Sequence, residues 1–113
     1  MESQLELYDE LMGLKDRFEH ALPGLATVQD AVRNEVYKDG ALSCKVKRLI
    51  ALGIALRAGC TGCILAQTRR ALEAGATEDE VLEATSVAVV MSGTTGGAES
   101  WRVVKLLGEL KKR

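Results

Sequence analysis

The sequence predicts an all-α domain. It contains a single proline in 113 residues, and the alternation of polar and apolar residues that would indicate strands is weak throughout. Apolar residues instead recur at spacings of three and four, as one face of a helix requires. With 47% hydrophobic and 27% charged residues, the chain is expected to form one globular domain over residues 1–113.

Two helices are predicted in the amino-terminal third. The first runs from Gln4 to Leu22, and Pro23-Gly24 ends it. Its apolar face comprises Leu7, Leu11, Leu14 and Phe18. Thr27 is the expected N-cap of the second helix, which Gly40 terminates. The apolar face of that helix comprises Val28, Ala31, Val32 and Val36.

Two further helices are predicted on either side of Gly59. Ser43 is the expected N-cap of the third, which runs to about Ala58. Its segment 49–56 is apolar on nearly all sides, so we expect this helix at the centre of the fold. The fourth helix follows Gly59 and ends at Gly75.

The last two helices are separated by glycines. Thr77-Glu78-Asp79-Glu80 fits the capping-box pattern and opens a fifth helix, apolar on most sides up to Met91. Segment 93–97 is predicted to be a loop, and a last helix runs from Ala98 to about Lys111. Its predicted inward residues are Trp101, Val104, Leu107 and Leu110. So much apolar surface exceeds what a small domain buries, and we expect a homo-oligomer.

Charge and hydropathy limit the classes of partner. A net charge of −1 gives no electrostatic reason to expect nucleic acid or an anionic membrane surface. No apolar run is long enough to cross a bilayer, and segment 1–6 is acidic and lacks the apolar part of a secretory signal. We therefore expect a cytoplasmic protein with no nucleic-acid or membrane partner.

The pair Cys60-Thr61-Gly62-Cys63 is the most informative motif. Two cysteines at this spacing can close a disulfide across one helical turn. They lie at a predicted helix start, where unpaired N–H groups and the positive end of the helix dipole favour a thiolate. We interpret the pair as a reactive dithiol. The alternative is two small residues of the core, since free cysteine is often buried.

The remaining candidate ligands do not indicate a metal site. Cys44, at another predicted helix start, is expected to be an inert, buried thiol. His20 is the only histidine and is expected at the surface near the end of the first helix. A zinc site would need both residues to converge with Cys60 and Cys63, and the sequence has no second Cys-x-x-Cys pair or paired histidine. We expect no metal.

These segments together resemble the carboxymuconolactone decarboxylase family. Segment 42–52 looks like the helix before that family's active-site turn, and Cys60-Thr61-Gly62-Cys63-Ile64 is similar to the redox motif of its alkylhydroperoxidase D branch. Segment 71–84 resembles the stretch that follows, and the likeness covers about Val36 to Gly97. The resemblance implies an all-helical fold that assembles as trimers or hexamers.

The resemblance also implies a role for each cysteine. In the alkylhydroperoxidase branch the second cysteine attacks a peroxide and becomes a sulfenic acid, which the first cysteine resolves to a disulfide. Carried over, Cys63 is the attacking thiol and Cys60 the resolving thiol. The implied substrate is a peroxide or a disulfide, the electron donor is a partner dithiol protein, and no metal or organic cofactor is implied.

The chain departs from the family pattern at two positions. The family motif has a glutamate twelve residues before the first cysteine and a histidine four residues after the second, which form a proton relay; Arg48 and Gln67 stand there. Neither side chain accepts a proton at neutral pH. We therefore expect weak peroxidase activity, in which Arg48 acts only as a cation that lowers a thiol pKa. The structural alternatives are a surface salt bridge for Arg48 and, for Gln67, an amide on the helix surface or in the interior.

Three functions remain open at this point. The favoured one is a peroxiredoxin-like thiol–disulfide enzyme with antioxidant activity. The absent relay leaves a second, a non-catalytic assembly protein or redox sensor on the same scaffold. The third is decarboxylation of γ-carboxymuconolactone, which the missing histidine weakens because that reaction relies on an acid–base group.

Overall fold

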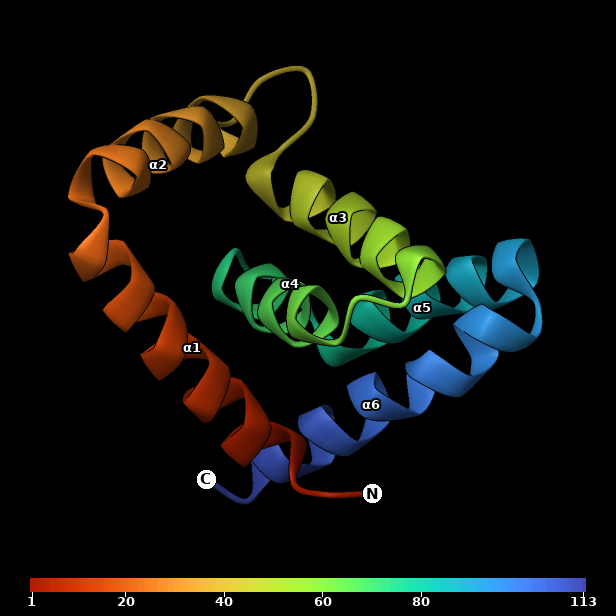
Figure 1. The fold of residues 1–113 in the computed structure, drawn as a ribbon. Coiled ribbons are helices and arrows are strands. Elements are labelled where there is room, and N and C mark those ends of the chain that lie inside the picture. The colour runs from red at the N-terminus through yellow and green to blue at the C-terminus, as the bar shows by residue number, and fades with distance from the viewer.

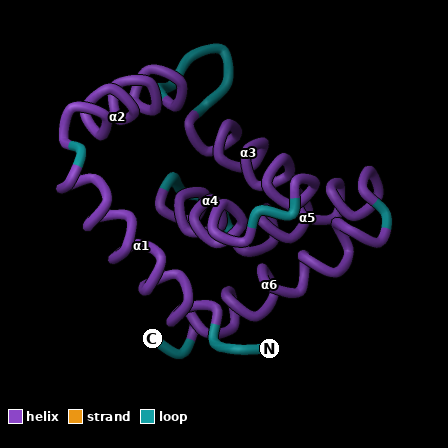
Figure 2. The backbone as a smooth tube through the Cα atoms, viewed as in Figure 1, coloured by secondary structure: helices purple, strands orange, loops and turns teal.

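The computed structural model describes residues 1–113, apart from the side chain of Thr95. The described chain forms six helices: α1 (Gln4–Ala21), α2 (Pro23–Tyr37), α3 (Cys44–Ala58), α4 (Thr61–Glu73), α5 (Glu78–Ser92) and α6 (Thr94–Lys111). Short loops join them, and Figure 2 shows no strand in the described chain. The predicted all-α class is therefore confirmed. None of these described helices is both long and apolar enough to cross a bilayer.

The core lies among α3, α4, α5 and α6, which form the compact part of the molecule (Figure 1). α3 packs on α4, α5 and α6, as its predicted central position requires. Each helix contributes small or branched apolar side chains. The buried cluster comprises Leu52, Ala55, Leu56, Ile64, Ala71, Ala76, Val81, Ala88, Val103 and Leu107. A smaller cluster of Tyr8, Leu65 and Leu106 attaches α1 to α4 and α6.

Glu109 of α6 holds the start of α1. Its carboxylate accepts hydrogen bonds from the Ser3 hydroxyl and from the backbone N–H groups of Gln4, at 2.7 Å, and Leu5, at 3.4 Å. These N–H groups have no partner within the helix, so the carboxylate caps α1 from outside. The hydrogen bond from Ser3, followed by those from the two N–H groups, lowers the pKa of Glu109 below its usual 4.5.

α2 extends away from the core and forms a bent arm with α1 (Figure 1). It begins at Pro23, so the prediction that Thr27 caps it was wrong. Proline is favoured at the first helical position, where its missing N–H would have had no partner. The Thr27 hydroxyl instead donates to the Pro23 carbonyl at 2.9 Å. The predicted apolar face of α2 exists, but none of its residues is buried.

The predicted loop at 93–97 is mostly helix. Gly93, with φ of 59°, makes the turn alone, and α6 begins at the next residue. Gly96 then lies directly against α5: a Cβ there would be 2.8 Å from the Ala88 carbonyl oxygen. The absence of a side chain at Gly96 permits this close approach of α5 and α6.

The inward face of α6 differs from the prediction. Trp101 and Val104 are 60% and 51% exposed, while Val103 and Leu106 are fully buried. Of the four residues expected inward, Leu107 is buried and Leu110 packs on the smaller cluster. The close contact at Gly96 fixes the rotation of α6 about its axis. Ser100, Val103 and Leu107, which lie on one face of the helix, therefore point toward the core, and Trp101 points outward.

Candidate functional site

The turn between α3 and α4 places the cysteine pair. Gly59 ends α3 with φ of 68°, a left-handed conformation that glycine adopts without strain. The N–H groups of Gly59 and Cys60 donate back to the carbonyls of Leu56 and Ala55, at 3.2 and 3.1 Å. Cys60 is therefore the N-cap of α4, and Cys63 lies in its first turn. The predicted helix start at the motif is confirmed.

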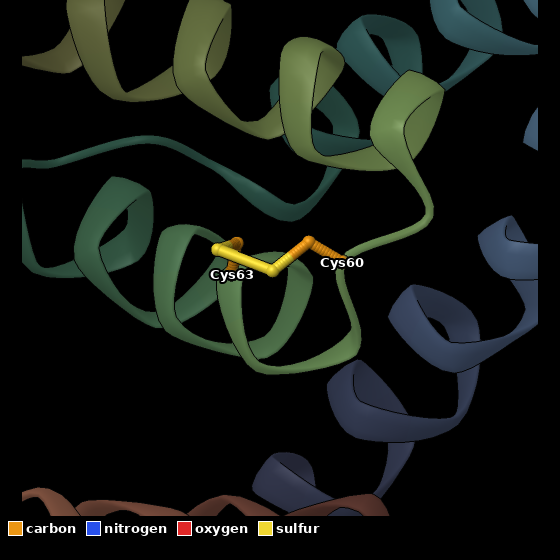
Figure 3. The surroundings of a disulfide bond; sticks show 2 residues. All are labelled: Cys60 and Cys63. Carbon is orange, nitrogen blue, oxygen red and sulfur yellow. A yellow bond between two sulfur atoms is a disulfide. The ribbon is translucent and has the colours of Figure 1, made fainter.

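Cys60 and Cys63 form a disulfide, and their Cα atoms are 5.3 Å apart. Figure 3 shows Cys60 at the end of the segment that leaves α3 and the bridge lying across the first turn of α4. Cys60 is half-buried, whereas Cys63 is exposed. Both residues lie at the positive end of the α4 dipole, which stabilises a thiolate when the bridge is open. Reduction of this bridge gives a dithiol in which one of the two residues, Cys63, is exposed to solvent.

Arg48 and Gln67 contact one another beside this motif. Arg48 Nη1 donates to Gln67 Oε1 at 3.2 Å, and both side chains are half-buried. Gln67 follows Cys63 by one turn of α4, so the two residues lie on the same face of the helix. The structure therefore brings both residues that the sequence placed in the relay to the face that carries Cys63.

Tyr37, the last residue of α2, completes the contacts of Arg48. The guanidinium carbon of Arg48 lies 3.4 Å from the centroid of the Tyr37 ring, a cation–π contact. Sequence reasoning missed Tyr37, because the apolar periodicity of α2 runs through other residues and an isolated tyrosine at a helix end carries no motif. The contact joins α2 to α3 across the loop between them.

Arg48 has no carboxylate partner among the described side chains. The ion pairs among the described residues use other cations, among them Lys45 with Glu80 at 2.9 Å and Arg102 with Glu99 at 2.9 Å. The surface salt bridge considered as the structural alternative for Arg48 is absent from them. Its charge is thus available to the dithiol or to a ligand.

The other candidate ligands are apart from the dithiol. Cys44 is unbridged and half-buried at the start of α3, where its N–H donates to Asp39 Oδ1 at 2.7 Å. His20 is exposed near the end of α1, and its contact with the Asp16 backbone raises its pKa above 6.5. Across the described residues, no three side chains of histidine, cysteine, aspartate or glutamate gather as metal ligands would.

An apolar groove of about 620 Å³ lies between α3 and α5. Neither cysteine lines it, and neither do Arg48 or Gln67. The lining comprises Val46, Leu49, Ile50, Gly53, Ile54, Arg57, Ala58, Ala84, Val87, Ala88, Met91 and Ser92. We therefore treat the groove as a feature separate from the dithiol, whose chemistry needs the sulfur atoms.

Sequence comparison relates the chain to known proteins. The family model described as "Carboxymuconolactone decarboxylase family" matches residues 23–106. An uncharacterised protein of Cupriavidus necator is 33% identical over 76 residues, which cover 67% of each chain. A protein of Paracoccus denitrificans, named as uncharacterised protein 4 in the cox locus, is 32% identical over 75% of this chain and 79% of its own length.

Solved structures share the fold. A carboxymuconolactone decarboxylase family protein from Legionella pneumophila superposes with a TM-score of 0.87 at 27% identity, over 96% of this chain and 97% of its own. A Thermotoga maritima protein of the same family, for which a part in the antioxidative response has been suggested, superposes with a TM-score of 0.70 at 29% identity. That match covers 77% of this chain and 90% of the other.

Proposed function

Because this chain belongs to the carboxymuconolactone decarboxylase family, we propose that it is a thiol–disulfide redox protein of alkylhydroperoxidase type. The single observation that carries the proposal is the Cys60–Cys63 bridge at the start of α4, with Cys63 exposed. An exposed sulfur at a helix N-terminus suits an attacking thiolate, and a half-buried neighbour suits the resolving thiol. The suggested antioxidative part of the Thermotoga relative agrees with this chemistry.

The reaction with a peroxide has two steps. The Cys63 thiolate attacks one peroxide oxygen, the O–O bond breaks, and Cys63 becomes a sulfenic acid while the alcohol leaves with a proton from water. The Cys60 thiol then attacks the Cys63 sulfur, the disulfide forms, and water leaves. A partner dithiol protein returns two electrons and two protons by exchange.

Reduction of a disulfide uses the same two thiols. The Cys63 thiolate attacks one sulfur of the substrate and releases one thiol. Cys60 then displaces the second thiol and closes the bridge, so that one disulfide and two protein thiols become two thiols and one protein disulfide. This route needs no general base beyond the thiolate itself. Arg48 and Gln67 supply no general base. The lack of a base at these positions therefore slows peroxide reduction more than it slows disulfide exchange.

A redox sensor is the second candidate, and the Arg48–Gln67 hydrogen bond favours it. The two side chains at the relay positions satisfy each other and take no proton. A sensor on this scaffold would undergo oxidation of Cys60 and Cys63 without rapid turnover. The two candidates differ in the rate at which the bridge re-forms after reduction, not in the residues that form it.

Thiol alkylation followed by mass spectrometry tests the proposal. The reduced protein is treated with hydrogen peroxide or hydroxyethyl disulfide and then alkylated. We expect Cys60 and Cys63 to lose their label together, Cys60→Ser to stop at a sulfenic acid or mixed disulfide on Cys63, and Cys63→Ser to stay reduced. Cys44→Ser is the control and should behave as the native chain does. Three labelled cysteines after oxidation, or a bridge to Cys44, would contradict the proposal.

We further propose that the protein is a cytoplasmic homo-oligomer, either a trimer or a hexamer. Large apolar side chains are exposed on several helices, among them α2, α3 and α5, which supports burial between copies. On these three helices they are Leu25, Val28, Val32 and Val36 of α2, Ile50 and Ile54 of α3, and Val87, Val90 and Met91 of α5. A dithiol that must be re-reduced works best in a compartment with thiol reductants, which supports the cytoplasm.

A further inference from the structure

We propose that Arg48 binds a carboxylate of the substrate, so that the dithiol prefers small disulfides that carry a negative charge close to the S–S bond. The inference rests on the proposed function, because it takes Cys63 as the attacking thiol. It adds the substrate class and gives Arg48 the part of a specificity-determining residue.

Two contacts fix the position of the Arg48 guanidinium. They are its contact with Tyr37, at 3.4 Å from the ring centroid, and its hydrogen bond to Gln67, at 3.2 Å. Gln67 lies four residues after Cys63, a rise of about 6 Å along α4. In a small disulfide whose carboxylate is a few bonds from the sulfur, the segment between the two groups spans a gap of this size. A substrate held by Arg48 therefore presents its disulfide at Cys63.

Arg48 also has unused hydrogen-bonding capacity. A guanidinium has five N–H donors in a planar fork that matches a carboxylate. Among the described residues, Arg48 donates from one nitrogen to Gln67 and forms no ion pair. Its stacking on Tyr37 involves the face of the group and uses none of its N–H donors. A half-buried cation held by an aromatic ring is pre-organised to bind an anion.

The positive charge at position 48 also favours an anionic substrate. The family likeness places a glutamate at position 48, which would repel an anionic substrate. Arginine reverses that charge, and the N-terminal end of α4 adds a positive partial charge on the same side. Two positive features on the face of α4 that carries Cys63 favour a substrate with a negative group.

One anionic and one neutral disulfide probe test the inference. One is 5,5′-dithiobis(2-nitrobenzoate), which carries two carboxylates, and the other is neutral 2,2′-dithiodipyridine. Stopped-flow absorbance gives the rate constant for the reaction of each probe with the reduced protein. The measured quantity is the rate constant of the anionic probe divided by that of the neutral probe. A change in the Cys63 pKa alters the thiolate fraction for both probes alike, so the ratio isolates recognition of the carboxylate.

Arg48→Met should lower the ratio by about tenfold to a hundredfold, the effect of one charge-assisted hydrogen bond. Methionine keeps a flexible side chain against the Tyr37 ring. Arg48→Lys should retain part of the preference because it keeps the charge and loses the fork. Arg113→Met removes the same charge at the exposed carboxyl end of the chain and should change the ratio by less than about twofold.

Salt provides a measurement on the native protein, in case Arg48→Met fails to fold. Added sodium chloride should slow the anionic probe and leave the neutral probe nearly unchanged. Equal slowing of both probes in Arg48→Met, with an unchanged ratio and no selective salt effect, would overturn the inference and leave the proposed function intact. Failure of both probes to oxidise Cys60 and Cys63 in the native protein would overturn the proposed function and this inference together.

Discussion

Arg48 of α3 and Gln67 of α4 are joined by a hydrogen bond of 3.2 Å, at the two positions where the family likeness places a glutamate and a histidine. The side chains at these two positions reach one another across α3 and α4 in the native chain. A glutamate and a histidine at these positions would therefore be able to orient one another, with the imidazole one turn of α4 from Cys63. The native pair provides a cation and an amide instead of a base.

Restoring both relay groups should raise peroxide reduction. The double variant Arg48→Glu, Gln67→His is expected to reduce hydrogen peroxide at least ~10²-fold faster than the native chain, the lower end of what a positioned general base supplies. Each single change should do much less, since the carboxylate orients the imidazole that takes the proton. Arg48→Glu alone should slow the reaction of the thiol with peroxide, because an anion raises the pKa of a neighbouring thiol.

The assay is peroxide consumption with a dithiol reductant, and Cys63→Ser is the blank. The same double variant should lose the preference for the anionic disulfide probe, since it no longer carries the guanidinium. A folded double variant that consumes peroxide no faster than the native chain would show that these positions do not form a relay in this protein.

Disruption of the α3–α5 groove should reduce the oligomeric mass. Ile54 lines the groove and is 65% exposed in the single chain, so Ile54→Glu places an unpaired charge in an interface without disturbing the core. Light scattering should give several chain masses for the native protein and a smaller mass for the variant. Ser86→Glu, at an exposed position of α5 outside the groove lining, is the control and should keep the native mass. A native monomer would refute the assembly.

The close approach at Gly96 should make that residue intolerant of a side chain. Gly96→Ala brings a methyl group to 2.8 Å from the Ala88 carbonyl oxygen, which forces α5 and α6 apart. We expect a loss of about 1–3 kcal/mol in the free energy of unfolding. Gly97→Ala meets nothing within 4 Å and should stabilise the helix by about 0.5–1 kcal/mol. Urea denaturation measures both; equal stabilities of the two variants would contradict the close contact.

Acid should weaken the attachment of α1 through Glu109. Hydrogen bonds from Ser3, Gln4 and Leu5 lower the pKa of this carboxyl below 4.5 in the folded protein. A lowered folded-state pKa means that the unfolded chain binds the proton more readily. The stabilisation is therefore complete above pH 4.5 and is lost as the pH falls through the folded-state pKa.

Glu109→Gln should remove this part of the pH dependence. The difference in unfolding free energy between the native chain and the variant is expected to be largest near neutral pH and to shrink on acidification below pH 4.5. Urea titrations across this range measure it. Glu35→Gln, on the exposed arm, provides a control carboxylate. A difference that stays constant with pH would show that Glu109 does not hold α1 through its charge.

The sequence by itself determined the elements whose signals are local. Ser43 caps α3, and Thr77 and Glu80 form the predicted capping box of α5. The Cys60–Cys63 bridge is local as well, since one helical turn separates the two residues. Such features depend on residues within four positions of each other, and the backbone conformation of a helix fixes their geometry wherever the helix lies.

The tertiary structure decided what depends on partners far along the chain. Which side of α6 faces inward follows from the contact of Gly96 with α5, so Trp101 is exposed although its spacing suits the core. The capping of α1 by Glu109 and the stacking of Arg48 on Tyr37 likewise join separate helices. Periodicity gives a helix an apolar face, but only its packing partners select which residues are buried and which charged groups meet, because these contacts form between surfaces that no local pattern aligns.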